Sequence, residues 1–384
     1  MAGAVRFWSD SMKMLHVFLL GIAVVMLAAV SCLSGHSGRD GGGGEAAVLV
    51  PRYGFFPSPP ELTVQSVVDT YQAINAHGNT VLFQYNVPWA AFAGDNGAAS
   101  AAWENIRHQV RLAHQYGLEI IFVVDPLNGL DRSNFVGLPA GWSPTFSDPR
   151  IRRAFSAFAR QVMEEIRPRY LGLASEINTY ADTRPDDFPY FLSLYREVYR
   201  NVKTISPQTQ VFVTFQWEGL NRLMPGQSGG TPFRISWDRI EAFEPELDVW
   251  AISSYPFIAF RRAADIPDDY YTPLMKRTDK PLAVAEGGYS SLPVGPFRGS
   301  VQDQADYLKK IHTQIGGRLS FWIYLLVNDL DMSSWGAHLT QAGQEQDLPT
   351  LNLFEYVGLT TTDRRPKPAL GVWDSLMGIE EREK

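Results

Sequence analysis

The sequence predicts an α/β fold, a single (β/α)₈ barrel in which eight parallel strands alternate with helices. Two observations lead to this prediction. Apolar, β-branched segments alternate strictly with amphipathic helical segments along the chain. The long loops, residues 125–147, 256–266 and 328–351, all follow strands, whereas the reverse connections are short. Long loops confined to one face are typical of a barrel. The main alternative is an open doubly wound sheet, which rarely contains eight strand–helix units.

Each predicted element has a local reason. The strands are short apolar runs, and the helices are longer segments with capping or stop residues at their ends. Asp148-Pro149 and Ser236 are helix-start signals, and Gly78 and Gly117 end helices. The predicted strands cover residues 48–55, 80–85, 119–124, 170–174, 210–215, 247–253, 281–285 and 319–325. The predicted helices cover residues 62–77, 101–116, 151–166, 188–204, 236–243, 270–277 and 301–315.

Composition limits the class of protein. With 384 residues, of which 45% are hydrophobic and 20% charged, the chain can bury a large core in one domain of about 250 residues or more. The net charge of −7 gives no electrostatic footprint for nucleic acid or an acidic membrane surface. The only cysteine is Cys32, so an intrachain disulfide is excluded.

The amino-terminal residues predict export. An apolar run at residues 15–30 follows Arg6 and Lys13, which is typical of a signal peptide and short for a membrane span. Cys32 follows Ala29-Val30-Ser31, which resembles a bacterial lipobox, so we expect a protein lipid-anchored to a bacterial membrane at Cys32. Ordinary cleavage, giving a periplasmic or secreted protein, and an uncleaved anchor are the alternatives. The expected organisation is a signal segment (1–32), a glycine-rich tether (33–47), the barrel (48–378) and a charged tail (379–384).

Two apolar runs end on a glutamate. Glu176 follows the fourth predicted strand and Glu286 follows the seventh. A carboxylate at the end of a buried strand is costly unless it is solvated, paired or functional. In a closed barrel the fourth and seventh strands face each other across the mouth, so the two carboxylates can converge there. Such a pair is what a retaining glycosidase needs, although either residue alone is more often a rim acid in an ion pair.

The motifs around these residues resemble those of the retaining (β/α)₈ glycoside hydrolases of clan A. Ser175-Glu176-Ile177-Asn178 is similar to the acid/base motif at the end of strand four, closest to that of the family 53 endo-β-1,4-galactanases. Glu286-Gly287-Gly288-Tyr289 resembles the nucleophile motif, and Ser253-Ser254-Tyr255 the strand-six segment whose tyrosine lies near the nucleophile. The resemblance implies that Trp322, at the end of strand eight, lies under the bound sugar. Ser175 departs from the pattern, because clan members usually have Asn there to bind the sugar 2-hydroxyl.

Other residues are candidates for sugar binding. Aromatic side chains after strands can stack on sugar rings, although most aromatic residues belong to the core. The expected binding residues are Ser175, Asn178, Tyr255, Trp322, Trp89, Trp217 and Tyr289, with Asp125, Glu218 and Asp329 as weaker candidates. No His-x-His ends the first strand, so a metal-dependent amidohydrolase is not expected, and neither a metal nor an organic cofactor is implied.

The sequence therefore predicts a retaining β-glycoside hydrolase acting on a β-linked oligo- or polysaccharide. Glu176 is the expected acid/base, with a raised pKa, and Glu286 the expected nucleophile, ionised at neutral pH. The alternative is a non-catalytic carbohydrate-binding barrel at the cell surface, which Ser175 suggests. The sugar, its linkage and endo or exo action are left open by the sequence.

Overall fold

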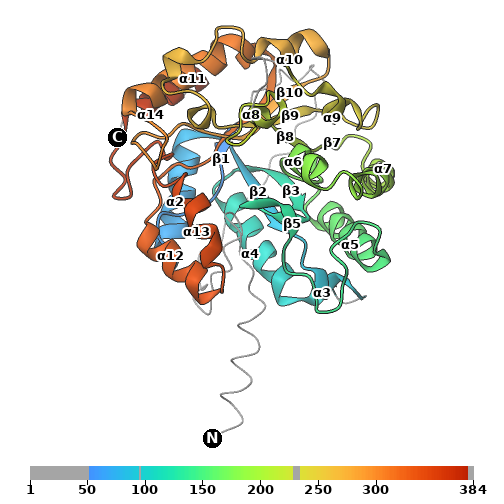
Figure 1. Cartoon of the computed structure of the whole chain (residues 1–384). Coiled ribbons are helices and arrows are strands. Elements are labelled where there is room, and N and C mark those ends of the chain that lie inside the picture. The colour runs from blue at the N-terminus through green and yellow to red at the C-terminus, as the bar shows by residue number, and fades with distance from the viewer. Residues whose placement is uncertain (1–51, 95–96, 228–233, 379–384) are drawn as a thin grey trace, which may run out of the picture.

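A computed structural model describes residues 52–94, 97–227 and 234–378 (Figure 1). The predicted signal segment, Cys32, the tether and the charged tail lie outside these residues. Among the described residues, no helix is both long enough and apolar enough to cross a membrane.

The core of the fold is a parallel barrel, as the sequence predicts. Its strands run in the order β7-β6-β3-β2-β1-β11-β10-β9-β8. β7 pairs with β6, and β8 pairs with β9, on either side of Val213, so the two segments bring the ends of the sheet together and the barrel is nearly closed. The strands are β1 (Arg52–Phe55), β2 (Thr80–Asn86), β3 (Glu119–Asp125), β6 (Tyr170–Gly172), β7 (Gln210–Phe212), β8 (Thr214–Gln216), β9 (Trp250–Ser254), β10 (Leu282–Gly287) and β11 (Leu319–Tyr324).

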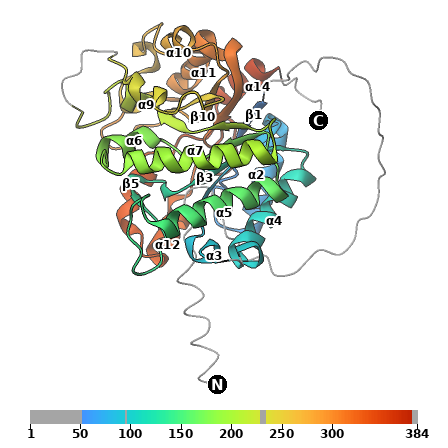
Figure 2. The ribbon, with the colours of Figure 1, turned by 90° about the vertical axis from the view of Figure 1, so that its right-hand side faces the viewer.

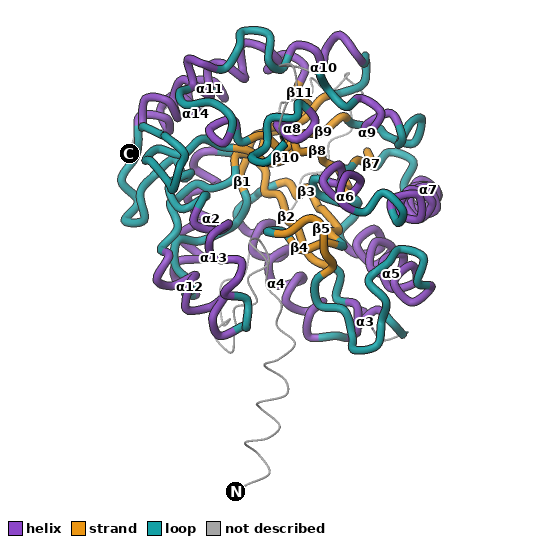
Figure 3. The backbone as a smooth tube through the Cα atoms, viewed as in Figure 1, coloured by secondary structure: helices purple, strands orange, loops and turns teal. Residues whose placement is uncertain are grey.

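Helices surround this barrel (Figures 2 and 3). They are α2 (Val64–His77), α4 (Ala101–Gln115), α5 (Pro149–Glu165), α7 (Phe188–Ile205), α9 (Trp237–Glu241), α10 (Thr272–Arg277), α11 (Val301–Ile315) and α14 (Pro368–Met377). Their starts follow from the sequence, because the side chains of Thr63, Ser100 and Ser300 accept hydrogen bonds from backbone N–H groups of the first turns. α5 and α7 lie side by side and are joined by an ion pair of 2.9 Å between Arg152 and Glu197.

Aromatic side chains fill the interior of the barrel near the amino ends of its strands. The ring centroid of Phe321 lies 4.9 Å from that of Tyr170 and 5.5 Å from that of Phe212. The guanidinium of Arg52 stacks over Tyr170 and forms an ion pair of 2.7 Å with Glu119. This packing closes one end of the barrel, so its interior can open only at the carboxyl ends of the strands.

The long loops at the carboxyl ends contain structure that the sequence analysis did not predict. A hairpin of β4 (Leu127–Asn128) and β5 (Asp131–Phe135) follows β3. α6 (Ile177–Thr183) follows β6, and α12 (Met332–Gln341) and α13 (Leu348–Asn352) follow β11. The hairpin turn is held by Asn128, whose Oδ1 accepts from the backbone N–H groups of Leu130 and Asp131.

Candidate active site

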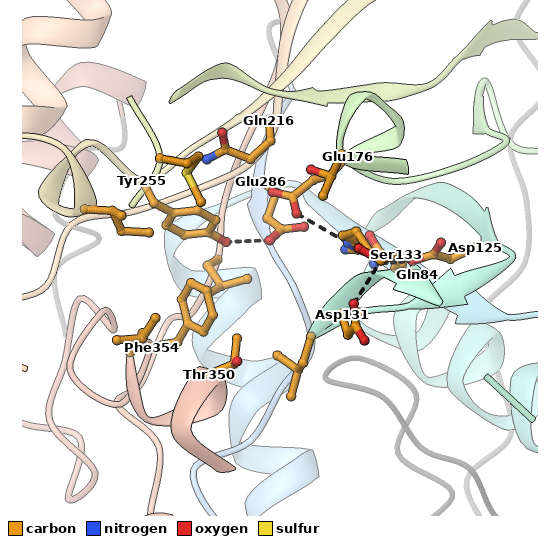
Figure 4. A pocket seen from close by; sticks show the side chains of 18 of the residues that line it. Gln84, Asp125, Asp131, Ser133, Glu176, Gln216, Tyr255, Glu286, Thr350 and Phe354 are labelled. Atoms are coloured by element: carbon orange, nitrogen blue, oxygen red, sulfur yellow. Dashed lines mark hydrogen bonds and ion pairs between the residues drawn. The ribbon is translucent and has the colours of Figure 1, made fainter. Parts of the chain in front are cut away.

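A cavity of about 290 Å³ lies at the carboxyl ends of the strands (Figure 4). Its volume is at the small end of the range for small-molecule sites, ~300–1,000 Å³. Glu176 and Glu286 both line it, and Figure 4 shows their carboxylates directed toward the same space. The barrel thus brings the two strand-end glutamates together. The other lining residues are Gln84, Asn86, Asp125, Gly129, Leu130, Asp131, Arg132, Ser133, Thr179, Gln216, Met224, Tyr255, Ile258, Leu325, Thr350, Leu353 and Phe354.

Glu176 is held in an unusual backbone conformation. It precedes α6 as its N-cap residue, with φ 49° and ψ 40°, in the left-handed region that non-glycine residues rarely adopt. Its backbone N–H donates to Thr214 Oγ1 at 2.8 Å. Its carboxylate accepts from Ser253 Oγ at 2.5 Å and from Arg132 Nε at 3.3 Å. Such strain, of order 1–3 kcal/mol, persists where surrounding contacts fix it and is typical of functional sites.

Glu286 is more deeply buried, with 8% of its surface exposed. Its Oε1 accepts a hydrogen bond of 2.6 Å from Tyr255 Oη. The pKa of Glu286 is raised to about 7: burial is the main cause and the nearby charge of Glu176 adds to it, whereas Arg132 and the Tyr255 hydrogen bond act in the opposite direction. With this pKa, Glu286 is only partly ionised at neutral pH in the free protein, whereas the sequence leads us to expect it ionised.

Arg132, which the sequence analysis missed, is the cation of the site. It comes from β5, and its side chain is 6% exposed. It forms an ion pair with Asp125, whose side chain is 1% exposed, and a second with Glu176. Burial raises the pKa of Asp125, and the charge of Arg132 opposes that rise. The only available signal for Arg132 in the sequence is its place in a long loop after strand three.

Two of the predicted binding residues lie behind the cavity wall. Asn178 donates to the backbone carbonyl of Gln216 at 3.2 Å and accepts from its N–H at 2.8 Å, and so positions a residue that does line the cavity. Ser175 is buried with its Oγ 3.1 Å from Thr214 Oγ1. It therefore does not take the place of an asparagine that would reach a sugar hydroxyl.

The predicted position of Trp322 under the sugar is wrong. Side chains alternate along a strand, so the neighbours of a residue that points into the barrel point outward. Phe321 points inward, and Trp322 packs outward against Trp373 and His312, at centroid distances of 5.3 and 6.4 Å. At the mouth, Leu325 lines the cavity instead.

The other predicted aromatic binding residues are also core residues. Trp89 is buried beside the hairpin and donates from Nε1 to the carbonyl of Val136 at 2.8 Å. Trp217 stacks on Tyr271, with 6.4 Å between the centroids, and Tyr289 packs against Tyr307 and Phe257. None of the three lines the cavity. Tyr255, in contrast, lines the cavity.

Of the weaker candidates, Asp125 lines the cavity and the other two support its surroundings. Glu218 is fully buried and accepts from Ser254 Oγ at 2.7 Å and from the backbone N–H of Tyr255 at 3.0 Å. It thereby fixes the segment that carries Tyr255. Asp329 forms a buried ion pair of 2.6 Å with Lys367, which ties the loop after β11 to the segment before α14.

Comparisons with known proteins bear on the fold. No family model matches the chain. No curated protein sequence matches it either. Among solved structures, it is similar to an exo-β-1,4-mannosidase from Opitutaceae bacterium strain TAV5, with a TM-score of 0.61 and 14% identity over 86% of this chain. The chain spans 59% of the length of that mannosidase.

Two further structures extend the comparison. A GH5_18 protein from Streptomyces cattleya, solved in complex with GlcNAc, has a TM-score of 0.60 and 19% identity, with 87% of this chain and 81% of that one covered. The GH53 catalytic domain from Ignisphaera aggregans has a TM-score of 0.51 and 15% identity, with 80% of this chain and 88% of that one covered. Family 53 is thus one of several similar families. The chain has a (β/α)₈ barrel fold that is similar to the folds of these three structures.

Proposed function

We propose that this protein is a retaining β-glycoside hydrolase, with Glu286 as nucleophile and Glu176 as acid/base. The observation that carries the proposal is the convergence of the two glutamates in one cavity of a barrel with this fold. In such a reaction one carboxylate attacks the anomeric carbon while the other protonates the leaving oxygen and then activates water.

The surroundings of Glu286 support its role as nucleophile. Tyr255 donates a hydrogen bond to Oε1, which leaves the second carboxylate oxygen for attack on the sugar. The charge of Arg132 and this hydrogen bond both oppose the rise caused by burial, and the pKa of Glu286 is about 7 with all of these effects together. The ionised form that attacks is therefore populated near and above neutral pH.

Glu176 is placed to exchange protons with a leaving group. The conformation of the chain at Glu176 and the bond from Ser253 Oγ fix its carboxylate at the cavity wall, where Figure 4 shows it beside Glu286. Arg132 links Glu176 to Asp125, so a shift of the hairpin would move the acid/base as well. Proton transfer from a positioned carboxylic acid contributes typically about 10²–10⁴-fold to rate.

Hydrolysis of aryl β-glycosides by the purified protein tests the proposal. Glu286→Gln should abolish turnover, because the amide cannot form the glycosyl-enzyme. Glu244→Gln is a matched control, since Glu244 lies in the connection between α9 and β9, at the opposite end of the barrel. Unchanged rates for Glu286→Gln, or equal losses in both variants, would refute the assignment.

A non-catalytic carbohydrate-binding barrel is the second candidate. It is favoured by Ser175, which is buried against Thr214 and offers no group to the sugar 2-hydroxyl. Contacts to that hydroxyl strengthen in the transition state, so their loss affects turnover more than binding. Saturable binding of β-linked oligosaccharides without any release of product would favour this candidate.

For the amino terminus we propose export with a lipid anchor at Cys32. The apolar run at residues 15–30 and the segment before Cys32 support this proposal. A Cys32→Ala variant released from the membrane fraction into the soluble fraction would support it, and an unchanged distribution would contradict it.

A further inference from the structure

The walls of the cavity are joined to one another around much of the barrel mouth. The hairpin after β3 and the segment after β11 meet where Asn128 Nδ2 donates to Asp347 Oδ2 at 3.5 Å. Asp347 is buried, with 5% of its surface exposed. Gly129 and Leu130 of the hairpin, and Thr350 after Asp347, line the cavity on the two sides of this contact.

The hairpin is also joined to α6 on its other side. Arg184, at the end of α6, donates to the carbonyl of Ser133 at 3.3 Å and to Asn134 Oδ1 at 3.1 Å. From below, Asn86 Nδ2 donates to the carbonyl of Leu127 at 2.6 Å. The hairpin is therefore fixed to the end of β2, to α6 and to the segment after β11, and it stands as a wall over β2 and β3.

The segment after β11 extends this wall from the loop after β1 to the residue that follows β9. The backbone N–H of Leu62, in the loop after β1, donates to Ser334 Oγ at 3.1 Å. Trp335 Nε1 donates to the carbonyl of Pro59 at 3.1 Å. At the far end of the segment, the ring of Phe354 packs against that of Tyr255, with 4.9 Å between the centroids. Figure 1 shows α13, β5 and α6 around this end of the barrel.

A glycan that is cut internally has to run through the site in both directions past the two carboxylates. Here the hairpin and the α12–α13 segment are in contact above β2 and β1, and residues of both line the cavity of about 290 Å³. A chain that enters this space ends against the wall. Only a chain terminus can then place its glycosidic bond between Glu176 and Glu286.

We propose that the protein is exo-acting: its cavity takes the terminal sugar of a β-linked glycan, and one sugar is released at each turnover. This inference rests on the proposed glycosidase function and adds to it the class of substrate, a free chain end, and the class of product, a single sugar. Asn128 and Asp347 act as positioning residues that hold the two parts of the wall together.

The order in which products form tests the inference. The purified protein is incubated with β-1,4-linked gluco-, manno-, galacto- and xylo-pentaoses that carry a fluorescent label at the reducing end. Loss of one sugar at a time from any accepted pentaose is the expected result. Early appearance of labelled disaccharide and trisaccharide together would overturn exo action while leaving the glycosidase function intact. Absence of hydrolysis of both the pentaoses and aryl β-glycosides would instead overturn the proposed function, and this inference with it.

A variant of the wall gives a second test. Asp347→Ala should raise the share of internal cleavage about fivefold, the change in population expected from one lost hydrogen bond. Hydrolysis of a small aryl β-glycoside should be unchanged, because Asp347 does not line the cavity. The matched control is Asp306→Ala on α11, whose partners are Lys309 and Gln302, both on the same helix. An equal product pattern in wild type and Asp347→Ala would show that the Asn128–Asp347 contact does not close the wall.

Discussion

Arg132→Met is expected to destabilise the protein strongly and in a pH-dependent way. The substitution keeps an unbranched side chain of similar reach and removes the guanidinium that pairs with both Asp125 and Glu176. Without it, the carboxylates of Asp125, Glu176 and Glu286 share one cavity with no cation among the residues that line it. Loss of one partner of a buried pair is costly because the other charge is left uncompensated.

The magnitude follows from burial. The side chains of Arg132 and Asp125 are 6% and 1% exposed, so their pair belongs to the class whose disruption costs about 3–5 kcal/mol. Burial already raises the pKa of Asp125, and removal of the opposing charge of Arg132 raises it further. A raised pKa of a carboxyl in the folded state costs stability as the pH increases. The loss should therefore be close to its full value at pH 8 and clearly smaller at pH 5.

Guanidinium chloride unfolding at both pH values measures this loss. The control is Arg262→Met, which breaks an exposed pair with Asp265 and should change the free energy of unfolding little. In the double variant Asp125→Asn/Arg132→Met, part of the lost stability should return, because the uncompensated charge is gone. A loss below about 1 kcal/mol that is the same at pH 5 and pH 8 would refute the electrostatic reasoning.

Three further predictions concern neighbouring residues. The pKa of Glu286 is raised from 4.5 to about 7, mainly by burial, so the wild type loses stability as the pH rises through this window. Glu286→Gln should therefore be more stable than wild type by about 3 kcal/mol at pH 8 and equal to it at pH 4.5, measured in the same unfolding assay. Tyr255→Phe removes a hydrogen bond that lowers the pKa of Glu286, so the acid limb of the pH profile of kcat/KM should move to higher pH; an unmoved limb would contradict this role. Trp322→Ala should cost about 3–5 kcal/mol of stability and leave KM unchanged, whereas a raised KM would restore Trp322 to the sugar site.

The barrel could be predicted from the sequence because its signals are local and repeated. The strands β2, β3 and β11 begin at the predicted residues, and α11 has the predicted bounds. The predicted fifth strand is divided at Val213 into β7, which pairs with β6, and β8, which pairs with β9. A run of apolar residues does not reveal such a division. The strand-end position of Glu176 and Glu286 was enough to place both in the cavity, because a barrel gathers the carboxyl ends of its strands.

The rest of the site depends on which face of a strand or loop a residue occupies. Trp322 and Leu325 are three positions apart at the end of one strand, and the alternation of faces decides that only Leu325 lines the cavity. Arg132 reaches Glu176 only because an asparagine turn folds the loop after β3 back over the barrel. The contact from Asn128 to Asp347 joins parts of the chain that no local pattern connects.

Covalent trapping is the most direct test of the central claim. The protein is incubated with 2-deoxy-2-fluoro β-glycosides that carry a good leaving group, and the labelled peptide is identified by mass spectrometry. We predict a single glycosyl ester on Glu286, formed in wild type and absent from Glu286→Gln. A protein that hydrolyses the parent glycosides while the label is found on another residue would contradict the account.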